Sequence, residues 1–407
     1  MVASRMLDFA DAQARLLALA NALGAERVAL IDAVGRVLAE DVRAPADVPA
    51  FDASIMDGYA VRSSELAPST DTRLPVAGES RAGSASPSLA PGTAFRIFTG
   101  APMPEGADAV VIQEEVRREG DVAIFTKAPK PGAFVRKRAD DLRTGDTVLA
   151  RGTRLGPPHL ALLASVDRPS VGIARAPLVS LLATGDELRE PGSAPRPGTI
   201  PESNGLALAA MMRGVGAAVR VLPKVPDDAA ATRDAIVMGL DGADVLVTVG
   251  GVSVGDHDLV RPALEAAGVV LDFWRVAIKP GKPLAVGTRG RTLALGLPGN
   301  PASAMVTCAL FVLPLLRAMQ GDRHPFPAPV RARLTRTVER VPGRLEFARA
   351  LLRWDGQGAV VEPLTHQASG AAWNVAMADA LAVLPKEQGK IEEGTVIDVY
   401  PFRELGL

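Results

Sequence analysis

The sequence contains a single cysteine and only four histidines in 407 residues. One cysteine excludes both an intramolecular disulfide and a cysteine-rich zinc site. Cys308 lies in the apolar run CALFVLPLL, which predicts a buried, inert thiol. The histidines are spread along the chain, so the sequence offers no histidine cluster as a metal site. The single cysteine fits a reducing compartment.

Long apolar runs and an excess of one charge are also missing. Nowhere do about 18 uncharged apolar residues follow one another. Asp8 and Asp11 precede any apolar stretch of signal-peptide length, so we expect a soluble, cytoplasmic protein that makes no contact with a membrane. Lys and Arg total 45 and Asp and Glu total 46, a net charge of −1, which disfavours nucleic acid as a partner.

The residues that are abundant are typical of a globular protein with several domains. Hydrophobic residues make up 48% of the chain and charged residues 22%, which provides ample apolar material for a core. At about 150 residues per domain, the length favours two or three domains. Apolar positions at helical spacing predict an opening helix over residues 8–22, with Gly24 as a stop.

The pattern of the sequence then changes three times. Short apolar runs cut by proline and glycine predict a β-rich insert over residues 45–141, and a short helix near residues 157–166 follows. From residue 178 strands and helices alternate, which predicts a parallel sheet covered on both faces. The helices of this region are expected at residues 203–213, 227–240 and 259–267. After residue 327 short strands return and favour a small β-barrel or sandwich.

The loops after these strands matter most for function, because open parallel sheets bind ligands at the carboxyl ends of their strands. TGDEL presents Asp186 and Glu187 to a hard cation or a ligand hydroxyl, with a turn followed by surface charge as the alternative. GGVSVGDHD offers the N–H groups of Gly250 and Gly251 to an anion, without the Gly-Lys-Ser/Thr of a Walker motif. His257 is interpreted as an exposed loop histidine in preference to a ligand.

Two further loops favour an oxyanion. In KPGKP, prolines stiffen a turn that carries Lys279 and Lys282, with a solvated basic turn as the alternative. In LPGNPAS, Asn300 is expected to cap a helix that begins at Pro301 and has Ser303 in its first turn, and such an N-terminus attracts anions. Together the four loops predict a phosphorylated or oxyanionic ligand, with carboxylates available for a divalent metal.

Two segments of the insert enclose polar groups between apolar flanks: FDASIMDGYAV around Asp57 and FTGAPMPEGADAVV around Thr99. These segments, followed by TGDEL, SNG, GGVSVGDHD, KPGKP and LPGNPAS in this order, resemble the molybdopterin molybdenumtransferases, the MoeA family that includes the gephyrin E-domain. The resemblance spans nearly the whole chain.

The resemblance implies an α/β multidomain protein with four domains. These are a helical elongated domain at residues 1–44 and 142–177, a β-rich insert domain at 45–141, a three-layer α/β/α molybdopterin-binding domain with a parallel-type sheet at 178–326, and a C-terminal β-barrel domain at 327–407. It also implies a homodimer with a shared active site, in which the insert of one subunit faces the α/β domain of the other.

The implied activity is a transferase reaction. Molybdenum from molybdate is inserted into adenylylated molybdopterin and AMP is released, with Mg²⁺ as the metal; a molybdopterin adenylyltransferase and downstream molybdoenzymes are implied partners. The implied catalytic residues are Asp57, Thr99, Asp141, Glu187 and Asp258, of which Asp57, Glu187 and Asp258 would also hold the metal. The implied substrate-binding residues are Gly250, Gly251, Ser253, Lys279, Lys282, Asn300, Ser303, Arg344 and Ser369.

Three positions depart from the usual family pattern. Val249 stands where Ser is frequent, Ala139 where Gly precedes the acidic pair, and Ala371 where Arg is common. The first removes a hydroxyl contact, the second affects the loop before Asp141, and the third bears on the role of Ser369.

Two alternatives stay open. A molybdopterin adenylyltransferase resembles residues 178–325 alone, and the insert argues against it. A non-catalytic scaffold that retains the fold, as the gephyrin E-domain does when it clusters receptors, is disfavoured by the intact Asp57, Glu187 and Lys279. We predict that Asp57→Ala and Glu187→Ala abolish cofactor maturation and leave a folded dimer.

Overall fold

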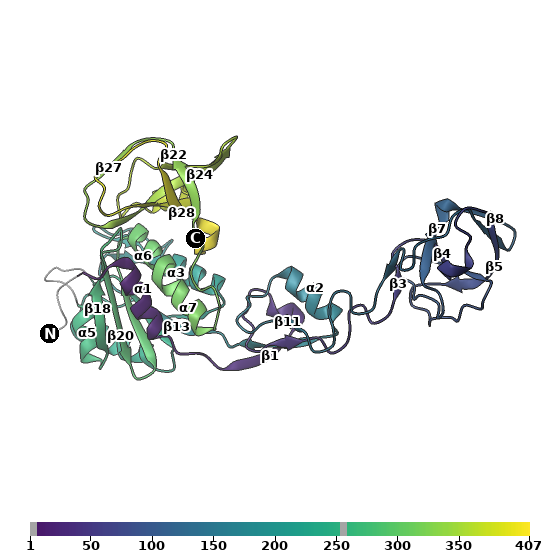
Figure 1. The fold of residues 1–407 in the computed structure, drawn as a ribbon. Helices are drawn as coiled ribbons and strands as arrows, with labels where there is room; N and C mark the ends of the chain where they lie inside the picture. Colours follow the sequence, from purple (N-terminus) through teal and green to yellow (C-terminus); the bar gives the residue numbers. More distant parts are fainter. Residues whose placement is uncertain (1–5, 253–258) are drawn as a thin grey trace. The chain divides into compact units, whose positions relative to one another are not determined.

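The computed structural model describes residues 6–252 and 259–407 and divides into two compact units (Figure 1). Unit 1 comprises residues 1–40, 151–156 and 172–407, and unit 2 comprises residues 41–150 and 157–171. Unit 2 is therefore inserted into the sequence of unit 1. The division into four domains is finer than these two units and stays a prediction.

Unit 2 is built on a six-stranded sheet with the order β7-β4-β6-β5-β9-β8. Its strands are β4 (Gly58–Val61), β5 (Thr72–Ser80), β6 (Ala94–Ile97), β7 (Ala109–Ile112), β8 (Val116–Glu119) and β9 (Val122–Phe125). All pairings are antiparallel except that of β5 with β6. Tyr59, Leu74 and Phe125 belong to its core. The β-rich character predicted for this part of the chain is confirmed.

Short elements complete unit 2 and the adjoining part of unit 1. In unit 2 they are β2 (Val42–Arg43) paired with β11 (Thr147–Leu149), β3 (Ala53–Ser54) paired with β10 (Val135–Arg136), η2 (Ser63–Glu65), η3 (Gln113–Glu115) and α2 (Pro157–Ser165). In the neighbouring sequence, β1 (Ala25–Ala29) pairs with β12 (Ser170–Ala174) and is followed by η1 (Leu30–Ala33). The predicted helix near residues 157–166 is confirmed as α2.

The α/β part of unit 1 contains a six-stranded sheet with the order β16-β13-β17-β21-β20-β18. Its strands are β13 (Leu178–Ala183), β16 (Ala218–Val221), β17 (Val245–Val249), β18 (Val270–Arg275), β20 (Pro283–Arg289) and β21 (Thr292–Leu297). The first four strands in the sheet order are parallel, but β20 and β18 are antiparallel to their neighbours. The predicted parallel sheet is confirmed for those four strands. The strand β20 runs antiparallel to β21 because only Gly290 and Arg291 join them, and so short a connection links antiparallel strands.

Helices cover both faces of this sheet. They are α1 (Phe9–Ala18), α3 (Asn204–Gly214), α4 (Ala229–Leu240), α5 (Val260–Ala266), α6 (Pro301–Thr307) and α7 (Leu313–Met319), with the π-helical segment η4 (Cys308–Val312) between the last two. One core cluster joins α1, α3, α6 and α7 to alternate strand residues such as Leu181, and a second joins α4 and α5 to residues such as Leu182. The predicted three-layer arrangement is confirmed, although α1 ends at Ala18 because Leu19 forms its C-cap.

The helical run from Pro301 to Met319 forms the centre of the larger core. It is long and apolar enough to cross a membrane, but 83% of its most apolar 18-residue window is buried inside the protein, as expected for a core helix. Cys308 lies in this run, and its burial raises the pKa of the thiol far above the ordinary value. The prediction of a buried, inert cysteine is consistent with this position.

The C-terminal part of unit 1 is a closed barrel. Its ring of strands is β24 (Leu345–Asp355), β25 (Gly358–Pro363), β22 (Val330–Leu334), β28 (Val396–Pro401) and β26 (Ala380–Leu384), which returns to β24 (Figure 1). A short strand from the α/β part, β19 (Ile278–Lys279), pairs with β24 in parallel and sets Lys279 opposite Glu346. The other short elements of unit 1 lie in both parts. In the α/β part β14 (Leu188–Arg189) pairs with β15 (Ile200–Pro201), and in the C-terminal part β23 (Val338–Glu339) pairs with β27 (Lys390–Ile391), alongside α8 (Ala372–Ala376) and α9 (Phe402–Leu405).

Candidate functional site

The turn after β13 holds Glu187 in a defined position. Gly185 has φ +146°, and a Cβ atom added there would lie only 2.4 Å from Oε2 of Glu187. Glycine therefore allows the Glu187 carboxylate to fold back against the turn. This carboxylate is exposed and has no ion-pair partner among the described residues. Asp186 is held differently, because its Oδ1 accepts the N–H of Asp227 at 3.1 Å.

The turn after β17 packs against the same edge. Gly250 and Gly251 both have positive φ, and added Cβ atoms would lie 2.6 Å from the Thr184 carbonyl oxygen and 3.3 Å from Thr184 Oγ1, respectively. The Thr184 hydroxyl is buried and has no hydrogen-bond partner within residues 6–252 and 259–407. A buried polar group without a partner beside two glycines marks a place where a ligand group can bind. Ser253 and Asp258, together with His257, lie outside the described residues.

The N-terminus of α6 contacts a loop of the barrel. Asn300 occupies the N-cap position, but its side chain does not cap the helix; its Nδ2 donates to Ser369 Oγ at 3.0 Å. The N–H of Ala302 donates to the Ser369 carbonyl at 3.0 Å, so the barrel loop satisfies a helix N–H. The predicted N-cap position of Asn300 and the helix start at Pro301 are confirmed, but a helix N–H is satisfied by Ser369 and not by the Asn300 side chain. Ser303 is buried in the first turn, as expected.

The KPGKP loop carries two lysines in different surroundings. Lys279 Nζ lies 2.9 Å from Glu346 Oε1, while Arg340 Nε lies 2.9 Å from the other carboxylate oxygen. Lys282 is half-buried, and its ammonium has no ion-pair partner within the described parts of the chain. Arg344 lies beside this network, with its guanidinium 3.5 Å from the Ile278 carbonyl oxygen. Of the two lysines, Lys282 is thus the better placed to attract an anion.

Arg349 is a candidate residue that the sequence reasoning missed. It is only 1% exposed, and its Nη2 donates to the Ala368 carbonyl at 3.1 Å. Its Nε is buried and has no hydrogen-bond partner in the described parts of the chain. Burial lowers the pKa of its guanidinium, and the charge of Glu346 opposes this shift. Gln367 fixes the Arg349 backbone by accepting its N–H at 3.0 Å and donating to its carbonyl at 2.9 Å. An arginine within the apolar strand FARALL was the available signal.

In unit 2 the structure brings together Asp57 and Thr99. Asp57 Oδ1 accepts both the N–H and the Oγ1–H of Thr99, each at 2.8 Å. These hydrogen bonds, with a smaller contribution from the charge of Arg96, lower the pKa of the Asp57 carboxyl. Gly58 is required next to it, because a Cβ atom there would lie 2.1 Å from the Val111 carbonyl oxygen. The lowered pKa keeps Asp57 ionised, and its side chain is partly exposed.

The other acidic residues are less clustered than a metal site requires. Asp141 is exposed and forms an ion pair with Arg136, and Ala139, where the family usually has Gly, adopts φ +63°. Within residues 6–252 and 259–407, no group of three or more His, Cys, Asp or Glu side chains is close enough to hold a metal. Because Asp57 and Glu187 belong to different units and Asp258 is not described, the metal set stays a prediction.

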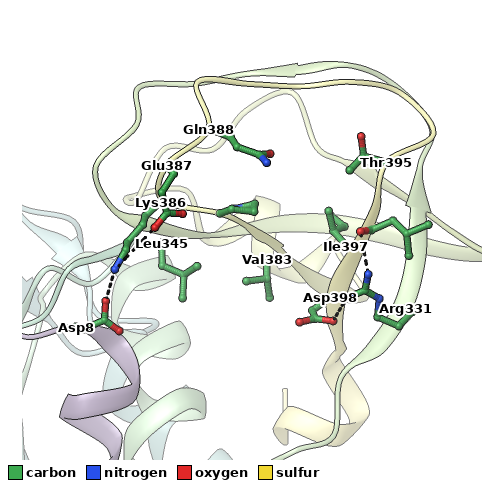
Figure 2. Close-up of a pocket in the computed structure, with 12 residues that line it drawn as sticks. Asp8, Arg331, Leu345, Val383, Lys386, Glu387, Gln388, Thr395, Ile397 and Asp398 are labelled. Atoms are coloured by element: carbon green, nitrogen blue, oxygen red, sulfur yellow. Dashed lines mark hydrogen bonds and ion pairs between the residues drawn. The ribbon is translucent and has the colours of Figure 1, made fainter.

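A separate hollow of about 410 Å³ lies where the start of α1 meets the barrel (Figure 2). Its charged groups are paired with one another: Lys386 with Asp8 at 2.6 Å and Arg331 with Asp398 at 3.1 Å. The Asp8 contact raises the pKa of Lys386, and Lys386 lowers the pKa of Asp8. None of the residues predicted for the site lines this hollow, so the candidate site is the strand edge with Glu187, Gly250, Lys282, Ser369 and Arg349.

Comparisons with known proteins agree along the whole chain. Three family models match in order: the MoeA N-terminal region (domain I and II) at residues 7–166, a probable molybdopterin binding domain at 180–318, and the MoeA C-terminal region (domain IV) at 331–402. A molybdopterin molybdenumtransferase of Haemophilus influenzae is 38% identical over 384 residues, which cover 93% of this chain and 94% of that protein.

Two further relatives extend the comparison. A molybdopterin molybdenumtransferase of Bacillus subtilis is 34% identical over 387 residues, with 93% of this chain and 90% of that protein covered. The solved structure of a molybdopterin biosynthesis MoeA protein from Pyrococcus horikoshii superposes with a TM-score of 0.85 at 27% identity, and covers 98% of this chain and all of that one.

Proposed function

Because the chain belongs to the molybdopterin molybdenumtransferase (MoeA) family, we propose that it inserts molybdenum into adenylylated molybdopterin, using molybdate and releasing AMP. The observation that carries this proposal is the strand edge of unit 1. There a free carboxylate, two glycine turns and cationic side chains of the α/β part and the barrel occur together.

The cationic part of this edge suits a tetrahedral dianion such as molybdate. The Arg349 guanidinium is buried, donates to the carbonyl of Ala368 next to Ser369, and has an Nε without a partner among the described residues. Lys282 adds an ammonium without a carboxylate partner among the described residues. Fixed donors in a partly dry site bind an oxyanion without reorganising, and guanidinium is well matched to oxyanion geometry. Lys279 and Arg344 contribute less, since Glu346 neutralises the first and a carbonyl engages the second.

The acidic part of the edge fits Mg²⁺, which prefers oxygen ligands. Glu187 supplies a carboxylate that is positioned by Gly185 and has no ion-pair partner in the described regions. Asp57, which Thr99 keeps ionised, and Asp258 complete the proposed ligand set. When bound, Mg²⁺ neutralises charge on the phosphate oxygens of the substrate. The Thr184 hydroxyl and the glycine N–H groups remain to orient the rest of the ligand.

The proposed enzyme is a cytoplasmic homodimer whose subunits share the active site. Exposed apolar side chains of unit 2 beside β3 and β10 support a protein contact there; they are Phe51, Ile55, Met56 and Phe134. Sedimentation velocity on Phe51→Ser/Ile55→Ser tests this surface, and a stable dimer in that variant contradicts its role. The preceding adenylyltransferase and downstream molybdoenzymes are the proposed partners.

The decisive experiment measures AMP release from adenylylated molybdopterin, with and without molybdate and Mg²⁺, coupled to reactivation of a molybdenum-free apo-enzyme. Molybdate-dependent release with reactivation supports the transferase. Tight binding without turnover favours the scaffold, and formation of adenylylated molybdopterin from ATP favours the adenylyltransferase. Asp57→Ala and Glu187→Ala are expected to abolish release; full activity in both variants contradicts the site.

A further inference from the structure

An arginine-rich hollow of about 500 Å³ lies at the end of α7 in unit 1. The helical run that begins next to Asn300 ends here, and at 1.5 Å per residue its 19 residues span roughly 28 Å, so the hollow is remote from the strand edge. Its charged lining residues are Arg154, Arg317, Asp322, Arg323, Arg403 and Glu404. None of them belongs to the site proposed for molybdenum transfer.

The carboxylates of this hollow are already engaged by two of the arginines. Asp322, with a side chain only 7% exposed, accepts from Arg154 Nε at 3.1 Å and Nη2 at 2.9 Å. Glu404 pairs with Arg403 at 3.4 Å. Across the described ranges, the guanidinium groups of Arg317 and Arg323 have no carboxylate within ion-pair distance. Four arginines against two carboxylates leave an excess of two positive charges.

Arg317 is the most constrained of these groups. Its Nε is buried and has no hydrogen-bond partner among the described residues, which is costly for a charged donor. Burial, reinforced by repulsion from Arg154, lowers the pKa of its guanidinium. Arg323 is anchored beside it, because its N–H donates to the Gly152 carbonyl at 3.1 Å and a Cβ atom at Gly152 would lie 2.5 Å from its Cγ. An anion in the hollow would pair with both guanidinium groups.

One wall of the hollow is apolar. Phe326 is 38% exposed and is followed by Pro327 and Ala328, all of which line the hollow. A volume of about 500 Å³ exceeds the needs of one inorganic oxyanion and lies in the range of small-molecule sites. Guanidinium forks bind phosphate through paired charge-assisted hydrogen bonds. We propose that the hollow binds an organic phosphate monoester, with its phosphate on Arg317 and Arg323 and its apolar part against Phe326.

Titration calorimetry of the full-length protein at constant ionic strength tests this site, with inorganic phosphate and phenyl phosphate as probes. Saturable binding is expected for both, and tighter binding for phenyl phosphate. Arg317→Gln and Arg323→Gln should each weaken binding at least about tenfold, because each removes a charge-assisted contact. Phe326→Ala should remove the advantage of phenyl phosphate. Arg289→Gln is the matched control: it removes the same charge from an exposed arginine at the end of β20, outside the hollow.

Three outcomes overturn the proposal. The first is no saturable binding at millimolar probe concentration. The second is that Arg289→Gln weakens probe binding as much as Arg317→Gln and Arg323→Gln do. The third is that Lys282→Gln abolishes probe binding while Arg323→Gln leaves it unchanged, because this result places the phosphate at the strand edge. Arg323 is exposed, so Arg323→Gln remains informative if Arg317→Gln fails to fold.

Discussion

Glu346 of unit 1 and Asp57 of unit 2 are both carboxylates held by donors, yet their surroundings differ. Glu346 is 4% exposed and lies between Lys279 and the buried Arg340. Asp57 is partly exposed and is held by the backbone and hydroxyl of one residue, Thr99. A buried carboxylate that joins two cations is required by the fold, whereas an exposed one with free lone pairs is available to a ligand. The two positions should therefore separate stability from activity.

The largest effect is expected for Asp57→Asn. Loss of the charge should lower molybdate-dependent AMP release by about 100-fold to 1000-fold, the range for removal of a group that stabilises developing charge. Because the amide retains the shape of the carboxylate and an oxygen for Thr99, the urea midpoint should fall only slightly, by the small stabilisation that the Thr99 hydrogen bonds give the ionised form. Asp121→Asn, at a fully exposed side chain of the same unit, is the control. Normal turnover in Asp57→Asn contradicts the proposed role.

Glu346→Gln should have the opposite effect, because it should mainly lower the stability of the protein. It leaves Arg340, with a side chain 3% exposed, without its carboxylate, and breaking a buried ion pair costs about 3 kcal/mol or more. Urea denaturation followed by circular dichroism measures the change. Glu393→Gln replaces an exposed glutamate of the same barrel and should have almost no effect. Equal midpoints for the two variants show that the Glu346 network does not stabilise the barrel.

Gly185→Ala tests how Glu187 is positioned. The new Cβ would lie 2.4 Å from Glu187 Oε2, so the carboxylate must move, and turnover should fall by roughly tenfold as for a displaced ligand of the metal. Gly192→Ala is a matched control, because Gly192 also has positive φ but has no atoms within 4 Å of an added Cβ. Both variants place Ala at a positive φ, +146° at Gly185 and +84° at Gly192, and only Gly185→Ala adds a clash. Equal turnover in both variants would rule out a positioning role.

The smallest effect is a shift in pH dependence. Thr99 lowers the pKa of Asp57, so its hydrogen bonds stabilise the fold above the unfolded-state pKa, and this stabilisation is lost as the pH falls through the folded-state pKa. Thr99→Val should raise the pKa of Asp57 and move the acid limb of the pH–rate profile to higher pH. Carbon-detected NMR of the Asp57 carboxyl measures the shift directly. Thr126→Val, an exposed threonine of unit 2, should leave both unchanged.

Local patterns predicted the elements but not their long-range contacts. The helices α3, α4 and α5 and the turns with Glu187 and Gly250 follow from hydrophobic periodicity and from glycine at strand ends. The bond from Asn300 to Ser369 could not be derived this way, because 69 residues separate the two and Ser369 has no local signal. Asn300 was interpreted as a cap since capping is local, but in the fold a tertiary donor–acceptor pair competes with it.

The same limit explains why the sequence did not distinguish the two lysines of KPGKP. Their spacing suggested an equivalent pair, yet β19 adds to β24 and places Lys279 against Glu346, while Lys282 has no such partner in the described structure. Arg349 was overlooked because a strand pattern does not distinguish a buried functional arginine from one whose charge reaches solvent. Charge pairing between distant segments therefore decides which predicted cations remain available.

The addition of β19 to the barrel has a consequence for modularity. Residues 278–279 belong by sequence to the α/β part, but they extend the hydrogen-bonded edge of β24. A barrel excised at residue 330 would lose this neighbour and expose that stretch of backbone to non-native pairing. The two parts should therefore unfold as one cooperative block, and recombination between relatives should be tolerated only where the β19 and β24 segments are inherited together.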